Sequence, residues 1–194
     1  MSSFLPEFIG TALLILLGNG VNANVTLAKA YGNNSGWIVI AFGWAVAVFS
    51  GVYVCASLGG SSHLNPAVTI ADAVKSDNWS KVPAFIAAQF SGAMTGALLA
   101  WLMYRKHFDE TDNADGKLGL FCTGPAIKST VDNLISEIIG TFVLVFGAFS
   151  ISGAKMNDTV FSLGALDALP VALLVLGIGL SLGGSTGYDI NPAR

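Results

Sequence analysis

The chain has 194 residues, of which 53% are hydrophobic and 11% charged, and its formal net charge is −3. This composition excludes an ordinary soluble domain, and a sequence without a basic tract argues against a nucleic-acid partner. The lengths of its apolar segments must therefore be compared with a bilayer, whose hydrocarbon core is about 30 Å thick.

Long stretches without charge predict five membrane-spanning helices. No charged residue lies between Glu7 and Lys29, and none lies between Lys29 and Asp72. The first stretch is too long and too lightly flanked for a cleaved signal peptide, so we interpret it as a span. The expected spans are residues 5–28, 36–57, 83–104, 132–153 and 166–183.

The sequence SSHLNPAVTIADAV, residues 61–74, interrupts the apolar pattern. Asn65 is a favourable N-cap, and Pro66 a favourable first helical residue because proline lacks the N–H that would be unpaired there. About ten residues of helical pattern follow, which reach roughly half-way across the hydrocarbon core. We therefore expect a re-entrant half-helix that starts near the membrane midplane. A turn in a loop is the alternative for this motif alone.

A polar segment, residues 105–130, follows the third span. Cys122 lies in this segment and Cys55 lies inside the second span, so we expect two free thiols rather than a disulfide. His63 and His107 lack the carboxylate or thiol neighbours that metal ligation or nucleophilic catalysis needs. The sequence therefore predicts neither an enzyme nor a bound cofactor or metal.

An internal repeat organises the whole chain. EFIGTALLILLG at 7–18 returns as EIIGTFVLVFG at 137–147, and HLNPAVT at 63–69 returns as DINPAR at 189–194. The two offsets, 137 − 7 = 130 and 191 − 65 = 126, are nearly equal. With three spans in each copy, the second repeat would be inverted in the membrane relative to the first. The predicted organisation is a first repeat over 1–104, a connecting loop over 105–130 and an incomplete second repeat over 131–194.

Inverted repeats would bring the two Asn-Pro motifs together near the membrane midplane. Irregular backbone is tolerated at that depth only where protein surrounds it or where it lines a watery cavity. Two opposed helix N-termini are each partly positive, and Asn65 and Asn191 add amide donors. Such a site suits a polar uncharged molecule and opposes cations.

The paired Asn-Pro-Ala motifs and the Glu-x-x-Gly-Thr start of each repeat resemble the aquaporin and glycerol facilitator (major intrinsic protein) family over the whole chain. The resemblance implies an all-α membrane protein: an inverted-repeat six-helix channel with two re-entrant half-helices. Five spanning helices and the first half-helix would be present here. It also implies a homotetramer in the lipid bilayer, with one pore in each subunit. The motif residues are Asn65, Pro66, Ala67, Asn191, Pro192 and Ala193.

The resemblance also assigns roles around the pore. Asn65 and Asn191 would donate hydrogen bonds to permeating molecules, and the backbone carbonyls before each motif would accept them. Glu7 and Glu137 match buried carboxylates that hold the re-entrant loops. His63 matches a position beside the pore, where it either lines the path or braces the loop.

Three residues of the third span have simpler interpretations. Gln89 either contacts the pore or forms an interhelical hydrogen bond, and we favour the hydrogen bond. Gly92 and Gly96 are spaced as Gly-x-x-x-Gly, which predicts close packing against another helix.

Four positions match the selectivity filter of the family. Arg194 would offer a fork of donors to adjacent hydroxyls, while its charge opposes cations. Tyr188 lies three residues before Asn191. Gly179 matches a position where water-selective members carry histidine and glycerol-conducting members carry glycine. A glycine here would leave the pore wide at the filter.

The fourth filter position depends on an alignment step. Trp44 matches it if one residue is inserted around residues 55–57; Ala45 and Phe42 are the alternatives, and Trp44 could also face lipid or the core. If Trp44 is correct, it forms with Tyr188 an apolar corner for the carbon backbone of a polyol, opposite the filter arginine.

These residues predict a passive channel for glycerol, water and other small uncharged solutes that excludes protons and ions. A water-selective channel is the first alternative, followed by a coupled secondary transporter and a structural membrane protein. A coupled transporter should place ionisable groups along its path, and the re-entrant segments offer only Asp189 and Arg194 as obvious ones.

Orientation and length complete the expectations. Three lysines would share the side of the N-terminus and five basic residues the other side, which favours an external N-terminus. The resemblance instead implies a cytoplasmic N-terminus in the cell membrane, and we follow it. Because the first repeat continues to about Tyr104, the offset predicts that the second ends near position 230, as part of a longer protein.

Overall fold

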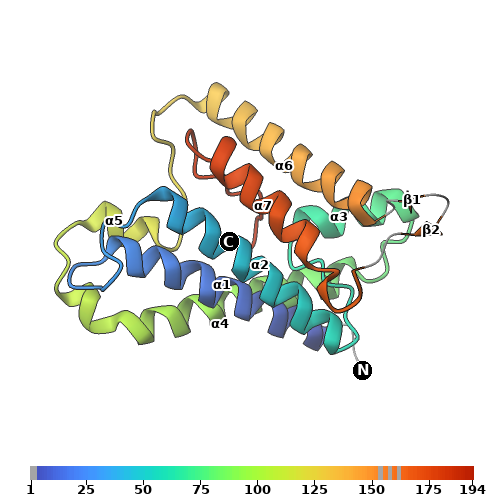
Figure 1. The fold of residues 1–194 in the computed structure, drawn as a ribbon, viewed down its shortest axis with the longest axis horizontal. Helices are drawn as coiled ribbons and strands as arrows, with labels where there is room; N and C mark the ends of the chain where they lie inside the picture. The colour runs from blue at the N-terminus through green and yellow to red at the C-terminus, as the bar shows by residue number, and fades with distance from the viewer. Residues whose placement is uncertain (1–3, 153–154, 157–158, 161–162) are drawn as a thin grey trace.

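The structure is a computed structural model that describes residues 4–152, 155–156, 159–160 and 163–194. Helices dominate it (Figure 1). The helices are α1 (Phe4–Thr26), α2 (Trp37–Ser57), α3 (Pro66–Ser76), α4 (Val82–Asp109), α5 (Ala114–Gly119), α6 (Thr130–Ser152), the 3-10 turn η1 (Gly164–Leu166) and α7 (Leu169–Ser181). Two short strands, β1 (Lys155–Met156) and β2 (Thr159–Val160), pair antiparallel after α6.

Four helices in the described residues, α1, α2, α4 and α6, are long and apolar enough to cross a membrane. The fifth expected span, 166–183, is the shorter helix α7, which has 13 residues. At 1.5 Å per residue α7 is roughly 20 Å long. Pro170 lies in the first turn of α7, and its missing N–H is tolerated there but would break a longer helix.

The expected half-helix is α3. Asn65 is its N-cap, and the side-chain oxygen accepts a hydrogen bond from Ala67 N at 2.8 Å. Pro66 is the first helical residue, and the helix stops at Asp77, which has a left-handed backbone (φ 52°). Its 11 residues span about 16 Å, so α3 reaches only half-way through a hydrocarbon core.

The first repeat packs around α1, which contacts both α2 and α4. A Cβ atom at Gly92 would lie 2.5 Å from Phe8 O, and one at Gly96 would lie 2.3 Å from Ala12 O. Only glycine allows α4 to approach the α1 backbone this closely. The predicted close packing at the Gly-x-x-x-Gly pair is confirmed.

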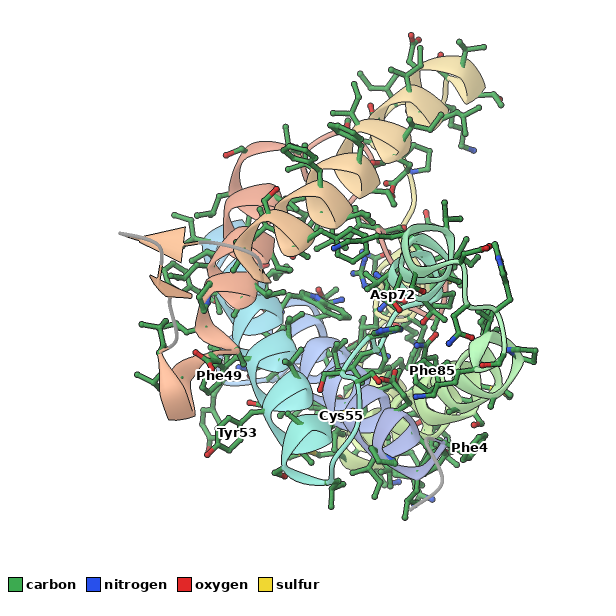
Figure 2. All side chains as sticks on the ribbon, turned by 90° about the vertical axis from the view of Figure 1, so that its right-hand side faces the viewer. Phe4, Phe49, Tyr53, Cys55, Asp72 and Phe85 are labelled. Atoms are coloured by element: carbon green, nitrogen blue, oxygen red, sulfur yellow. The ribbon has the colours of Figure 1, made fainter. Side chains whose placement is uncertain are left out.

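The second repeat is more open. Helix α7 packs on α2, and α6 contacts α7 and α3; Figure 1 shows α6 beside α7, with the C-terminus in the middle of the molecule. In the most apolar 18-residue stretch of α6, 11% is buried inside the protein, whereas 44% of the equivalent stretch of α1 is buried. Helix α2 has an outer and an inner face. Figure 2 shows Phe49 and Tyr53 on the outer face of this helix, whereas Cys55 faces the interior.

The connection between the repeats differs from the expected loop. Helix α4 continues to Asp109, beyond the predicted end at 104, because the first charged residues end the apolar segment but not the helical hydrogen bonding. Helix α5 forms within the loop, and the Asn113 side chain caps it by accepting from Gly116 N at 2.9 Å. Cys55 and Cys122 are both free thiols, as expected.

Candidate functional site

A cavity of about 150 Å³ touches both Asn-Pro motifs. Helices α1, α2, α6 and α7 supply most of its apolar wall, and the two re-entrant segments supply most of its polar groups. The apolar part includes Leu14, Val48, Leu144 and Val175, and the polar part includes His63, Asn65, Asn191 and Arg194. Among the described residues, no group of three or more His, Cys, Asp or Glu could hold a metal ion.

Each motif asparagine donates a hydrogen bond to the backbone of the other re-entrant segment. Asn65 Nδ2 donates to Ile190 O at 2.8 Å, and Asn191 Nδ2 donates to Leu64 O at 2.9 Å. Each side-chain oxygen accepts the backbone N–H two residues further on, at 2.8 and 3.1 Å. Because an amide nitrogen carries two hydrogens, each asparagine keeps one donor for a molecule in the cavity.

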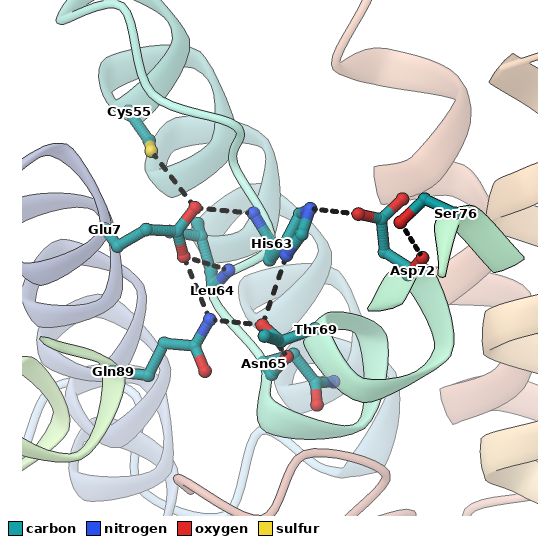
Figure 3. A network of polar contacts seen from close by, with 9 residues as sticks. All are labelled: Glu7, Cys55, His63, Leu64, Asn65, Thr69, Asp72, Ser76 and Gln89. Atoms are coloured by element: carbon teal, nitrogen blue, oxygen red, sulfur yellow. Dashed lines mark hydrogen bonds and ion pairs between the residues drawn. The ribbon is translucent and has the colours of Figure 1, made fainter. Parts of the chain in front are cut away.

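Glu7 holds the first re-entrant segment from inside α1 (Figure 3). Its carboxylate is 0% exposed and accepts from His63 N and Leu64 N at 2.8 Å each. Gln89 Nε2 donates to the same group at 3.0 Å, and Cys55 Sγ lies 3.8 Å away. A buried carboxylate needs such donors to replace its hydration. Gln89 therefore forms the interhelical hydrogen bond that we favoured.

Glu137 on α6 has the corresponding place in the second repeat. It accepts from Asp189 N at 3.3 Å and from Ile190 N at 3.2 Å. The acceptors and donors follow the same offsets as the sequence motifs, so the repeat extends to individual backbone hydrogen bonds.

His63 both lines the cavity and braces the loop, so the two alternatives for it coexist. Thr69 Oγ1 accepts from Gln89 at 2.8 Å and donates to Asn65 O at 3.1 Å, which uses its only hydrogen. His63 Nδ1, at 3.2 Å from the same oxygen, must therefore donate to it. The other ring nitrogen faces Asp72 Oδ2 at 3.8 Å (Figure 3).

Arg194, Trp44 and Tyr188 meet in the cavity wall. The guanidinium carbon lies 4.1 Å from the Trp44 ring centroid and 5.8 Å from that of Tyr188. Cationic groups are attracted to aromatic faces at these distances. The structure thus places three of the four expected filter residues around one point.

The structure also separates the three candidates on α2. Trp44 is buried in the cavity wall, whereas Phe42 is 52% exposed on the outside of the helix and Ala45 is buried away from the cavity. A Cβ at Gly18 would lie 2.3 Å from the Trp44 ring, and Trp44 Nε1 donates to Asn22 Oδ1 at 3.1 Å. Asn22 was not among the residues expected from the sequence, although an amide within an apolar span is an available signal.

Gly179 lies behind Tyr188. A Cβ at Gly179 would be 3.0 Å from Tyr188 Cζ, so this glycine makes room for the tyrosine ring. Gly179 O accepts from Trp37 Nε1 at 2.9 Å, and the Trp37 and Tyr188 rings meet edge to face at 5.8 Å. The role of Trp37 had no sequence signal, because it depends on how α2 and α7 pack.

Comparisons with known proteins agree with this geometry. Residues 1–194 match the family model described as Major intrinsic protein. The chain is 52% identical over 195 residues to a probable glycerol uptake facilitator protein of Thermotoga maritima, covering 100% of this chain and 80% of that protein. It is 50% identical over 201 residues to the glycerol uptake facilitator protein of Streptococcus pneumoniae, with the same coverage. The X-ray structure of the aquaglyceroporin from Plasmodium falciparum matches with a TM-score of 0.85 at 29% identity, covering 99% of this chain and 76% of that one.

Proposed function

Because the chain belongs to the major intrinsic protein family, we propose that it is a membrane channel for glycerol and other small uncharged solutes. The observation that carries this function is a cavity lined by both Asn65 and Asn191, each of which donates a hydrogen bond to the backbone of the other re-entrant segment. Relatives named as glycerol uptake facilitators support glycerol as the solute.

The cavity wall suits a polyol because its two sides differ. Trp44 and Tyr188 present aromatic surface, while Arg194 presents N–H donors beside them. Glycerol likewise has a carbon edge and a hydroxyl edge, so each edge meets matching chemistry. Water fits the same donors.

Ion exclusion follows from the same residues. Apolar walls give a cation nothing to replace its hydration shell, and the Arg194 charge opposes its entry. The N-terminus of α3 adds partial positive charge beside Asn65. The free N–H of each asparagine orients a water as acceptor, which interrupts a proton-conducting chain.

The protein is an integral membrane protein, and we propose that it is a homotetramer of the cell membrane with a cytoplasmic N-terminus. Cys122 offers a direct test of orientation, because it is exposed in the loop between the repeats while Cys55 is buried. A membrane-impermeant maleimide should label Cys122 on intact cells and leave a Cys122→Ser variant unlabelled. Labelling only after the membrane is opened would reverse the orientation.

The channel is tested by stopped-flow light scattering on liposomes that carry the full-length protein. We expect glycerol and water permeabilities well above those of empty liposomes, unchanged by an imposed proton or sodium gradient. Rapid water flux without glycerol flux would identify the water-selective alternative. Glycerol flux that depends on the gradient would identify a coupled transporter.

A further inference from the structure

Trp44 is held in the cavity wall by contacts on several sides. Its ring lies against Gly18, where a Cβ atom would be 2.3 Å away, and the Arg194 guanidinium carbon lies 4.1 Å from the ring centroid. At the nitrogen edge, Trp44 Nε1 donates to Asn22 Oδ1 at 3.1 Å. The first two contacts act on the apolar surface of the ring, whereas the hydrogen bond acts on its one polar atom.

Asn22 uses both ends of its amide. The oxygen accepts from Trp44, and Nδ2 donates at 3.4 Å to Leu120 O in the segment between the repeats. An indole nitrogen only donates and a carbonyl oxygen only accepts, so these two partners determine the orientation of the amide. An amide therefore satisfies both neighbours without bringing a charge into the span.

The hydrogen bond between Trp44 and Asn22 is buried at both ends, since the two residues are 4% and 6% exposed. A buried N–H without an acceptor is costly, so loss of the Asn22 oxygen would drive Nε1 toward another acceptor. The cavity beside the ring offers such acceptors on the solutes that enter it. Asn22 is not among the described residues that line this cavity, so it can act on the pore only through Trp44.

This inference rests on the proposed function, in which the Trp44 ring forms an apolar surface for the carbon edge of glycerol. We propose that Asn22 is a positioning residue of the pore, which keeps the indole N–H of Trp44 turned away from the cavity. Leu120 O holds the amide in turn, so the segment between the repeats supports the filter from outside. Glycerol flux depends on Asn22 more than water flux does, because water has no carbon edge to place against the ring.

Asn22→Leu tests the hydrogen bond in liposomes that carry the full-length protein. Leucine has the same number and branching of side-chain heavy atoms as asparagine but no acceptor. Stopped flow gives the glycerol and water permeabilities after the values for empty liposomes are subtracted. We expect the ratio of glycerol to water permeability to fall by about three- to tenfold, the factor that one hydrogen bond supplies.

Two further variants frame that result. Asn22→Asp keeps an oxygen that can accept from Trp44 and, when protonated, a donor for Leu120 O, so it should keep the original ratio. Asn24→Leu is the matched control, because it makes the same substitution in the same helix at an amide that accepts instead from Gly32 N at 3.1 Å. It should leave the ratio unchanged.

A double variant shows whether Asn22 acts through the indole nitrogen. Trp44→Phe keeps an aromatic ring but has no N–H. In this background Asn22→Leu should not lower the ratio further, because the hydrogen bond is already absent and the two changes are not additive. An equal fall in the ratio with and without the Trp44→Phe change would overturn the proposal.

Hydrogen exchange tests the hydrogen bond in the original protein. The NMR signal of the Trp44 indole N–H is identified as the one that Trp44→Phe removes. We expect this proton to exchange much more slowly than that of Trp79, which is 51% exposed. Equally fast exchange at the two indoles would contradict the proposal without any change at Asn22.

The outcomes separate this inference from the proposed function. If the original protein passes no glycerol, the channel function fails. If it passes glycerol and Asn22→Leu keeps the original ratio with normal water flux, only the role of Asn22 is overturned.

Discussion

Two carboxylates hold the two re-entrant segments, and their surroundings differ. Glu7 is fully buried and accepts two backbone N–H groups at 2.8 Å, with Gln89 as a third donor. Glu137 is half-buried and accepts the equivalent two N–H groups at 3.3 and 3.2 Å. Both repeats use the same two backbone hydrogen bonds, and among the described residues Glu7 has an additional side-chain N–H donor in Gln89.

The difference comes from what covers each carboxylate. Helix α4 closes over Glu7 and brings Gln89, because Gly92 and Gly96 let it approach α1. The comparison teaches that the same pair of backbone hydrogen bonds holds both re-entrant segments, and that α4 adds a side-chain donor to the pair at Glu7.

The largest expected effect is at Glu7. Glu7→Gln keeps the size of the side chain but replaces one carboxylate oxygen with an NH2 group, which cannot accept from Leu64 N or Gln89 Nε2. Leaving buried groups unpaired should lower the free energy of unfolding by about 3 kcal/mol. Thermal unfolding in detergent and glycerol flux in liposomes measure the loss.

Glu137→Gln is the matched variant for that comparison. Its two backbone hydrogen bonds, at 3.3 and 3.2 Å, are longer than those of Glu7, so we expect a smaller loss of about 1 kcal/mol. Equal losses for the two variants would mean that the covering of Glu7 by α4 does not strengthen its hold on the loop.

Packing between α1 and α4 can be tested at Gly96. Gly96→Ala places a methyl group 2.3 Å from Ala12 O, a backbone atom that cannot rotate away. We expect a loss of about 1 to 3 kcal/mol in the free energy of unfolding, as for other overpacked cores. Gly177→Ala is the control, since an added Cβ meets no atom within 4 Å there. A similar loss in both variants would contradict the packing argument.

Selectivity should respond at Gly179 with a smaller effect on stability. A histidine there would press on the Tyr188 ring, 3.0 Å from the new Cβ, and move it toward the cavity. We expect Gly179→His to reduce glycerol flux at least about tenfold and water flux much less, because the larger solute needs the wider pore. Stopped-flow measurements on liposomes give both rates.

Gly177→His provides the control for that substitution. It adds the same side chain to the same helix at a position with open space, so the ratio of glycerol to water permeability should not change. A similar change in the ratio for both variants would place the effect in α7 as a whole rather than beside Tyr188.

The sequence predicted the half-helix and the pairing of the motifs because the first depends on local chemistry and the second on an internal repeat. Asn65 caps α3 because its side chain accepts a backbone N–H that would otherwise be unpaired. Pro66 begins the helix because proline has no N–H to leave unpaired there. The covering of Glu7 by Gln89 was partly predictable, since an amide in an apolar span needs a partner.

Other features required three-dimensional packing. Neighbouring positions on α2 differ by about 100° around the helix axis, so a one-residue uncertainty could not separate Trp44 from Ala45. Likewise, spacing alone could not show that Gly179 lies behind Tyr188 rather than in the cavity wall. The extent of α7 was overestimated because charged residues mark the ends of apolar segments, whereas Pro170 determines where the helix starts.

The smallest expected effect is at a third carboxylate, which lies in solvent. Glu110 follows the end of α4, and Lys29 Nζ hydrogen-bonds to it; this hydrogen bond and the lysine charge lower the pKa of Glu110 below its usual value of 4.5. A lowered pKa in the folded state stabilises the fold above the ordinary pKa, and this contribution disappears as the pH falls through the lowered value. Because both side chains are exposed, water and salt screen the pair. Glu110→Gln should therefore lower thermal stability at pH 7 by less than Glu137→Gln does, and this loss should shrink as the pH falls and as salt is added. A loss as large as that of Glu137→Gln would show that the connection between α1 and α4 matters more than its exposure indicates.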